Sequence, residues 1–232
     1  GPHPRFRGSW QLYSHAATRR KEKIRWFIFL LLTTNLSHAE GEKAGDFDYY
    51  VMALSWSPTW CALTGDERKS PQCRDGANFG WILHGLWPQN EIGWPSYCRT
   101  NARNPSRSQT AAEADLFGTG GNAWHQWNKH GRCTGLTASA YYQLARDAYA
   151  QINRPEVFRQ IDQTIRLPAD VVEAAFLESN PTLQPDQITI TCRQDSIQET
   201  RICLTRELEP RACGKDVSRD CTLDDAVMAP IR

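Results

Sequence analysis

Short apolar runs along the chain predict strands. The run FDYYVMALSW, residues 47–56, is rich in aromatic and β-favouring residues and has few polar positions, which indicates a strand buried on both faces. A second apolar stretch, residues 80–83, is predicted to stop before Gly85 and Pro88, because both residue types interrupt strands. Two further strands, joined by a polar turn, are predicted at residues 188–192 and 199–204.

Helical spacing of apolar positions occurs later in the chain. Residues 137–152 have this spacing, with Thr137 or Ser139 as the predicted N-cap. Because predicted strands and helices do not alternate strictly, we expect an α+β fold with a central, mainly antiparallel sheet and several packed helices. Shorter helices are predicted at residues 155–161 and 168–177, a polar loop at 99–110, and a loop tail held by cysteines.

The first 39 residues have the pattern of an export signal. A basic cluster precedes the apolar run WFIFLLL, and a polar stretch then ends at Ala39, a small residue of the kind that signal peptidase prefers. The apolar run is much shorter than the roughly 20 residues that a membrane-spanning helix needs. We therefore expect residues 1–39 to be a tag or leader with a secretory signal, cleaved before Glu40. Residues 40–232 are then expected to form one domain that is secreted or periplasmic and free of the membrane.

Removal of the predicted leader changes the charge balance. Seven of the 27 Lys and Arg residues but only one of the 26 Asp and Glu residues lie in residues 1–39, so the remainder carries a net charge of about −5. A net-negative chain is not a general binder of polyanions, and a nucleic acid would have to be held by a local cluster of positive groups. All eight cysteines follow the leader, and an even number behind an export signal predicts four disulfides, whose pairing the spacing leaves open.

The segment NAWHQWNKHGRC, residues 122–133, brings several reactive side chains together. A helix turns by about 100° per residue. Trp124 and Trp127 are then expected to face the core, and Gly131 is expected to stop the helix. Four polar side chains fall within an arc of about 140° on one face, namely His125, Gln126, Lys129 and His130.

Chance placement of histidines on a solvated helix face is the plain alternative. It does not explain why the third of the three histidines after residue 40 is His84, in another unusual stretch, WILHGLWPQN. A three-histidine metal site is a second alternative, but Lys129 would place a cation beside the ion, so we expect no metal and no cofactor. Two histidines and a lysine without a nucleophile of their own favour phosphoryl transfer by a general acid and a general base. The nucleophile would be the 2′-OH of RNA.

The same two stretches carry a family resemblance. WILHGLWP, residues 81–88, and HQWNKHGRC, residues 125–133, resemble in order and spacing the two active-site segments of the ribonuclease T2 family of secreted endoribonucleases. The start FDYYVMALSWSPTWC is similar to the family's first strand, and the resemblance covers most of residues 46–221. It implies an endoribonuclease that cleaves single-stranded RNA to 2′,3′-cyclic phosphates with little base specificity. Apart from the resemblance, a 2′-OH nucleophile would make the enzyme specific for RNA over DNA.

The resemblance implies a role for each residue of the two segments. His130 would take the proton of the 2′-OH, and His84 would protonate the 5′-oxygen leaving group. Lys129 would stabilise the phosphorane, and His125 would help to hold the phosphate. Gln126 stands where the family usually has Glu, although some bacterial members resemble this chain in carrying Gln. We expect its amide to donate to a phosphate oxygen and its carbonyl to accept from Lys129.

A base-binding region is predicted after His84 apart from the resemblance, because stacking on bases needs aromatic side chains near the site. Trp87 and Tyr97 are expected to stack on bases. Core packing is the plain alternative for both and for Trp94, and it fits Trp94 better than the other two. Gln89 stands where the family often has an acidic residue that contacts the base. The resemblance also implies four disulfides, Cys61–Cys73, Cys98–Cys133, Cys192–Cys221 and Cys203–Cys213.

Single-stranded RNA is therefore the expected partner of a monomeric protein. One rival hypothesis is a catalytically silent, secreted relative that binds RNA or regulates, with Gln126 as the sign of lost activity. The intact His84, Lys129 and His130 argue against it. A second rival is a disulfide-rich carbohydrate-binding module, suggested by the nine tryptophans, but it does not explain where the histidines fall.

Overall fold

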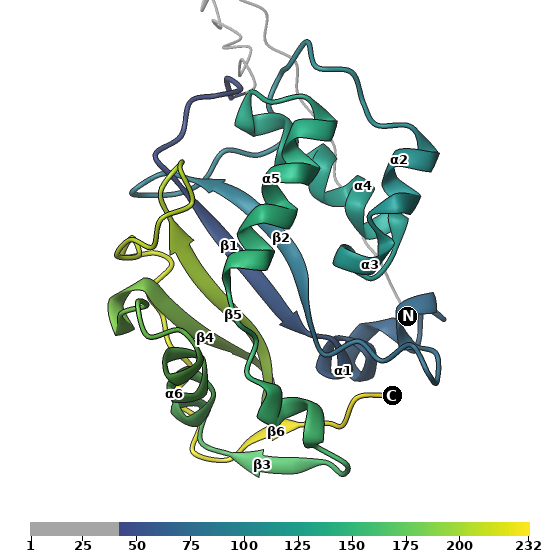
Figure 1. The fold of residues 1–232 in the computed structure, drawn as a ribbon, viewed down its shortest axis with the longest axis vertical. Coiled ribbons are helices and arrows are strands. Elements are labelled where there is room, and N and C mark those ends of the chain that lie inside the picture. The colour runs from purple at the N-terminus through teal and green to yellow at the C-terminus, as the bar shows by residue number, and fades with distance from the viewer. Residues whose placement is uncertain (1–41) are drawn as a thin grey trace, which may run out of the picture. The chain divides into compact units, whose positions relative to one another are not determined.

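The computed structural model describes residues 42–232, and these residues form a six-stranded sheet with helices packed against it (Figure 1). The predicted leader lies outside these residues. The strand order is β2-β1-β5-β6-β3, with β4 paired to β5, and every pairing is antiparallel except that of β5 with β6. The predicted fold class is confirmed. The strands are β1 Tyr49–Trp56, β2 Trp81–Gln89, β3 Ile165–Leu167, β4 Ile188–Arg193, β5 Ser196–Leu204 and β6 Ala226–Met228.

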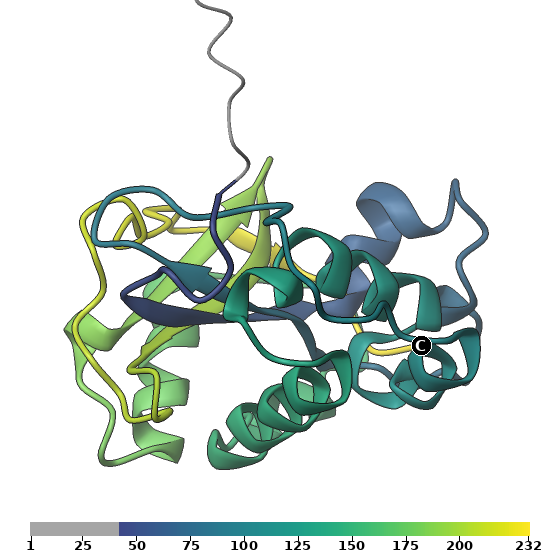
Figure 2. The same cartoon turned by 90° about the horizontal axis from the view of Figure 1, so that it is seen from above.

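Helices cover one face and one edge of this sheet. Figure 1 shows α5 lying across β1 and β2, and α6 in front of β4. The view from above shows α5 and α6 on the same side of the sheet (Figure 2). The α-helices are α1 Ser57–Trp60, α2 Arg107–Ala112, α3 Ala114–Phe117, α4 Gly120–Lys129, α5 Ala138–Gln151 and α6 Ala169–Ser179. Shorter turns are the π-helical Cys61–Gly65 and the 3₁₀ turns Pro71–Cys73, Gly131–Thr134, Glu156–Gln160 and Pro185–Gln187.

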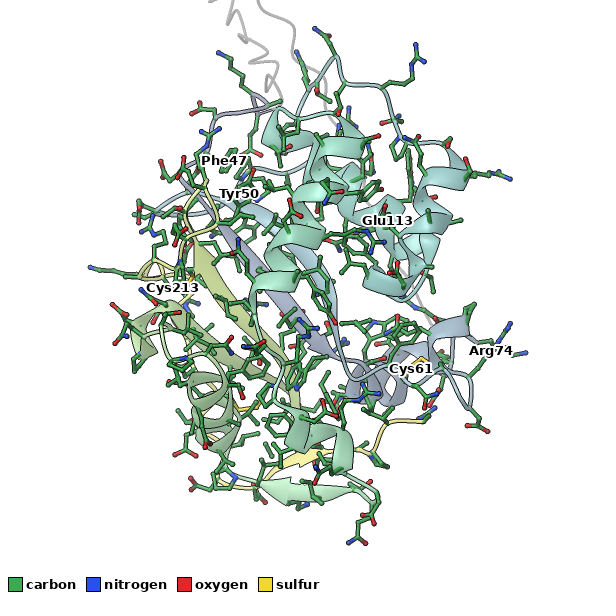
Figure 3. The ribbon with its side chains drawn as sticks, viewed as in Figure 1. Phe47, Tyr50, Cys61, Arg74, Glu113 and Cys213 are labelled. Carbon is green, nitrogen blue, oxygen red and sulfur yellow. A yellow bond between two sulfur atoms is a disulfide. The ribbon has the colours of Figure 1, made fainter. Side chains whose placement is uncertain are left out.

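The main core fills the layer between the sheet and the helices. All residues of β1 are buried, as predicted, and their side chains alternate between the two faces of the sheet. Figure 3 shows side chains filling the space between α5 and the sheet, with Phe47 beside Tyr50 at the upper end. The centroids of these two rings are 4.9 Å apart. The predicted helix at residues 137–152 is confirmed as α5, and its N-cap is Thr137, whose hydroxyl accepts from the Ala140 N–H at 3.2 Å.

Several elements differ from the sequence prediction. The strand β2 does not stop before Gly85 and Pro88 but continues to Gln89. Because β2 is an edge strand, it tolerates a residue without an N–H. The polar loop predicted at 99–110 already contains the start of α2, where Ser106 and Gln109 form a reciprocal capping box. The tail is not only loop, because β6 pairs there with β3.

All four disulfides are present with the implied pairing, which confirms that prediction. Cys98–Cys133 ties the segment after β2 to the turn that follows α4. Beside this bridge, the Tyr97 N–H donates to the Lys129 carbonyl at 2.8 Å. The end of α4 is thus fixed against the segment after β2. Among residues 42–232, no helix is long and apolar enough to cross a membrane.

Candidate active site

A β-bulge on β2 places His84. Leu83 and Gly85 pair with successive residues of β1, so His84 is an extra residue between them. The extra residue shifts the alternation of side chains, and His84 and Trp87 come to lie on the same face although they are three positions apart. Their rings meet edge to face with centroids 5.2 Å apart. This face of the sheet is the one that α5 and α6 leave uncovered.

The helix α4 presents the second group of side chains. Its buried side includes Gln126 and His130 as well as Trp127, whereas His125 is exposed and Lys129 is half-buried. With this side of the helix buried, Trp124 lies at the surface and is 39% exposed. The prediction that both tryptophans of this helix face the core is therefore wrong for Trp124.

Gly131 follows α4 for a different reason from the one predicted. The helix ends at Lys129 and continues directly into the 3₁₀ turn Gly131–Thr134, without a left-handed glycine at position 131. A Cβ at this position would lie 2.7 Å from the ring of Tyr141 and 2.8 Å from that of Trp127. Its small size therefore allows the turn to pack against the core, and the prediction of a helix stop is wrong in its mechanism.

A buried carboxylate binds one nitrogen of His84. Nδ1 of His84 lies 2.5 Å from Oε1 of Glu199, whose side chain is 2% exposed, against 44% for His84. The other oxygen of Glu199 accepts from Arg201 at 2.8 Å. Burial raises the pKa of Glu199, but the hydrogen bond and charge of His84, together with Arg201, outweigh burial and lower it. The carboxylate is therefore ionised, and Nε2 is the nitrogen of His84 left for other contacts.

Small residues on β1 allow Glu199 to reach His84. The strand β1 lies between β2 and β5, and it places Ser55 opposite Glu199 and Ala53 opposite Arg201. Because neither residue has a long side chain, the side chain of Glu199 extends over β1 to the neighbouring strand β2. Sequence reasoning missed Glu199 and Arg201. The only available signal was a pair of charged residues, two positions apart, in a predicted strand.

Trp87 connects the two halves of the site. Its ring stacks on His130 with centroids 5.2 Å apart and an interplanar angle of 28°. The guanidinium of Arg201 lies 5.5 Å from the centroid of the Trp87 ring. The indole Nε1–H donates to Oε1 of Gln126 at 2.8 Å. Because the indole nitrogen can only donate, it fixes the oxygen of Gln126 toward Trp87 and leaves the NH₂ group for another partner.

This contact corrects the expected role of the Gln126 carbonyl. It accepts from Trp87, and no hydrogen bond from Lys129 to Gln126 is present in the described part of the chain. The contact depends on Gly85, because a Cβ there would lie 2.1 Å from Nε1 of Trp87 and 2.2 Å from Oε1 of Gln126. The glycine of the bulge therefore leaves room for the bond between the strand and the helix.

His130 has an environment unlike that of His84. It is 6% exposed, and its Nδ1 is buried without a hydrogen-bond partner among residues 42–232. Burial, followed by the charges of Lys129, His84 and His125, lowers the pKa of His130 to about 3. Burial and the same lysine also lower the pKa of His125. Within the described residues, no carboxylate forms a salt bridge with Lys129, so its charge is free to act on a bound anion.

Two cavities meet at these side chains. The smaller, of about 250 Å³, is lined by all five predicted catalytic residues and by Trp87, Gln89 and Trp94. The larger, of about 370 Å³, is lined by Ser55, Gln72 and Asn122, among others. Three residues line both cavities, namely His84, His125 and Gln126.

The predicted base-binding residues separate into two groups. Gln89 is buried, and its amide nitrogen lies 3.4 Å from Oδ2 of Asp216, which also accepts from the Gly93 N–H at 2.7 Å. An acidic residue thus stands near Gln89, but it comes from the C-terminal part of the chain. Tyr97 is 52% exposed and lines neither of the two cavities.

Trp94 differs from its prediction. It is 54% exposed and lines the smaller cavity, so the prediction of core packing is wrong. The bond from the neighbouring Gly93 to Asp216 holds this loop at the cavity rather than in the core. In residues 42–232, no group of three His, Cys, Asp or Glu side chains is arranged to hold a metal ion.

Comparison with known proteins identifies the family of this chain. Residues 47–213 match the model of the ribonuclease T2 family. A protein of Aeromonas hydrophila named "Ribonuclease" is 45% identical over 109 residues, covering 47% of each chain. A "Probable ribonuclease" of Haemophilus influenzae is 29% identical over 120 residues, covering 47% of this chain and 44% of its own length. The matched region thus spans about half the length of these two relatives.

Solved structures share the fold at low sequence identity. The RNase-related protein from Calystegia sepium superposes with a TM-score of 0.61 at 16% identity, covering 82% of this chain and 98% of its own. RNase NT, solved in complex with 5′-AMP, has a TM-score of 0.59 at 20% identity, covering 81% of this chain and all of its own. These similarities show the fold alone.

Proposed function

Because this chain belongs to the ribonuclease T2 family, we propose that it is an endoribonuclease that cleaves single-stranded RNA by transphosphorylation. The observation that carries the proposal is the pair His84 and His130. They line one cavity in opposite environments, with Lys129 beside them. An ionised carboxylate contacts His84, whereas burial keeps His130 neutral. Two titratable groups whose environments differ in this way provide an acid and a base at one pH.

The proposed residues account for both proton transfers and for the charge on the phosphate. His130 takes the proton of the 2′-OH, and the 2′-oxygen then bonds to phosphorus. The bond from phosphorus to the 5′-oxygen breaks, and the leaving oxygen takes the proton from Nε2 of His84. The products are a 2′,3′-cyclic phosphate and a free 5′-OH. Lys129 stabilises the negative charge on the phosphorane, and His125 and the NH₂ group of Gln126 hold its oxygens.

The two cavities suit the nucleotides on either side of the cleaved bond. A phosphate beside His84, His125 and Gln126 would lie where the cavities meet. One base would then enter the smaller cavity beside Trp87 and Gln89, with the exposed Trp94 available for stacking. Stacking is tolerant of base identity, which supports cleavage with little base specificity. Tyr97 stays a proposed contact for RNA that extends beyond the cavity.

Cleavage without added metal is the direct test. The purified protein is incubated with RNA and with the matching DNA in EDTA, beside a His84→Ala/His130→Ala variant prepared in parallel as a control for contaminating nuclease. We expect 2′,3′-cyclic phosphate ends from RNA only, and a bell-shaped pH profile with its optimum below neutral. Activity that is lost in EDTA and restored by zinc would contradict the mechanism.

A catalytically silent RNA-binding protein is the second candidate. The observation that favours it is that Lys129 forms no salt bridge with a carboxylate in the described structure, while Gln126 stands at the position for one. If the parent binds RNA without cleaving it and Gln126→Glu starts cleavage, this candidate replaces the first.

Export is proposed from the sequence and from the disulfides. Four disulfides suit an oxidising compartment, and one matched relative is named "Extracellular ribonuclease LE". We propose a monomeric protein, secreted or periplasmic, whose mature chain begins at Glu40. N-terminal sequencing of exported protein is expected to start there, and a start before residue 30 would contradict the proposed signal.

A further inference from the structure

Given the acid role proposed above for His84, we propose that Glu199 is a positioning residue of the reaction, with Arg201 as its anchor. Glu199 fixes the proton of His84 on Nδ1 and thereby aims Nε2 at the leaving oxygen. The proposal rests on the geometry of three strands rather than on either active-site segment. The carboxylate that it invokes lies 115 residues away from His84 along the chain.

Both oxygens of Glu199 are paired with residues of the site. Glu199 is a buried carboxylate on a central strand, and burial of a charge is costly unless the charge is paired. One oxygen is used by Nδ1 of His84 and the other by Arg201. Since an ionised carboxylate only accepts, Nδ1 must carry a hydrogen. Nε2 is then the nitrogen whose proton is exchanged with substrate, and the ring cannot rotate without breaking a charged hydrogen bond.

Arg201 limits how the carboxylate can move. Its guanidinium binds the second oxygen of Glu199 and also lies near the ring of Trp87, which stacks on His130. The proton donor and the proton acceptor are thus linked through a continuous set of contacts across β5, β2 and α4. A second-row contact of this kind holds a catalytic group to the geometry that the reaction needs.

The test compares two substrates for one variant. A dinucleotide has a poor leaving group that needs a proton from His84, whereas a nucleoside 3′-(4-nitrophenyl phosphate) releases 4-nitrophenolate without one. Loss of a hydrogen bond to a charged group corresponds to a fall in kcat of roughly 10- to 100-fold. We expect Glu199→Gln to show this fall with the dinucleotide at unchanged KM, and to retain nearly the parent rate with the aryl ester.

Two further variants and one spectroscopic measurement complete the test. Glu113→Gln removes a carboxylate that pairs with Arg146 outside the site, and it is expected to leave both rates unchanged. Arg201→Met is expected to act in the same direction as Glu199→Gln, but less strongly. Ring ¹⁵N shifts of His84 are expected to show the proton on Nδ1 in the parent and a mixture of tautomers in Glu199→Gln.

The possible outcomes are distinguishable. If the parent cleaves both substrates and Glu199→Gln loses them equally, or loses neither, the positioning role is overturned. Should the parent be inert on both, the proposed function itself fails. The ¹⁵N shifts then still decide whether Glu199 fixes the proton on Nδ1, because a tautomer that is the same in the parent and in Glu199→Gln excludes it.

Discussion

The site has a strand side, which carries His84, and a helix side, which carries His130, and the two histidines have opposite environments. On the bulge of β2, His84 is partly exposed, and its Nδ1 contacts an ionised carboxylate. After α4, His130 is buried, its Nδ1 has no partner in the described structure, and a lysine precedes it. Among the described residues, the ring on the strand side has a side-chain acceptor for its Nδ1–H, and the ring on the helix side has none.

This difference supports the proposed assignment of the acid and the base. A carboxylate that binds Nδ1 of His84 suits a proton donor at Nε2, and the burial of His130 suits a proton acceptor. Position in the sequence would not have decided the matter, because the ring is the same in both places. Variants that remove or reverse the difference between the two sides therefore test the proposed roles most directly.

The largest expected effect comes from removing either ring. General acid or base catalysis contributes around 10²- to 10⁴-fold, so His130→Ala and His84→Ala should each lower kcat on RNA by about that factor. The two variants should differ on an aryl ester, whose leaving group needs no proton. There, His84→Ala is expected to recover most of the parent rate, and His130→Ala is expected to recover none.

The opposite pattern would exchange the two roles. If His130→Ala alone recovers activity on the aryl ester, then the buried histidine is the acid, and the assignment from the two environments is wrong. Circular dichroism and the melting temperature of each variant serve as the control for folding. Comparable rates for both variants on the ester would mean that neither histidine acts only as the acid.

The helix side of this comparison could be predicted from the sequence, and most of the strand side could not. His125, Gln126, Lys129 and His130 belong to one segment, so helical periodicity alone brings them together. The pattern of polar and apolar residues does not predict the bulge at His84, because the bulge depends on how β2 pairs with β1.

Glu199 was missed for a similar reason. Its contact with His84 crosses an intervening strand, and it exists only because Ala53 and Ser55 are small. Local periodicity carries no information about which strands become neighbours. The error at Trp94 has the same origin, since the loop is held at the cavity by Asp216, from the far end of the chain.

A medium effect is expected at Gln126, which joins the two sides through Trp87. Gln126→Ala removes the bond to Nε1 of Trp87 and the NH₂ donor for the phosphate, so kcat should fall roughly 10- to 100-fold. Gln126→Glu keeps an acceptor for Trp87 and adds a charge beside Lys129 and His130. Because a nearby negative charge favours a protonated ring, its acid limb should move to higher pH.

Steady-state kinetics across pH separate these two variants. Asn128→Ala is a matched control, because it changes an amide on the same helix that lines neither of the two cavities. If Gln126→Ala and Asn128→Ala lose activity equally, the bond to Trp87 has no special role. An unchanged acid limb in Gln126→Glu would mean that position 126 does not act on the charge of His130.

The smallest expected effect concerns stability rather than rate. Burial lowers the pKa of folded His130 to about 3, from an ordinary value of 6.5. Between these values the unfolded chain binds the proton and the folded protein does not, so the free energy of unfolding falls as pH falls below 6.5. The slope from one such group is at most about 1.4 kcal/mol per pH unit.

Urea unfolding at pH 7 and pH 5 measures this slope. The window lies above the range in which Glu199 titrates, because its pKa is lowered from 4.5. His125 adds to the slope in the same direction, since its pKa is lowered as well. The parent should therefore lose more stability between the two pH values than His130→Asn, which keeps a polar side chain of similar size without a titratable ring. Equal losses in the two proteins would mean that the fold does not hold His130 neutral, and the base would then have to be assigned on other grounds.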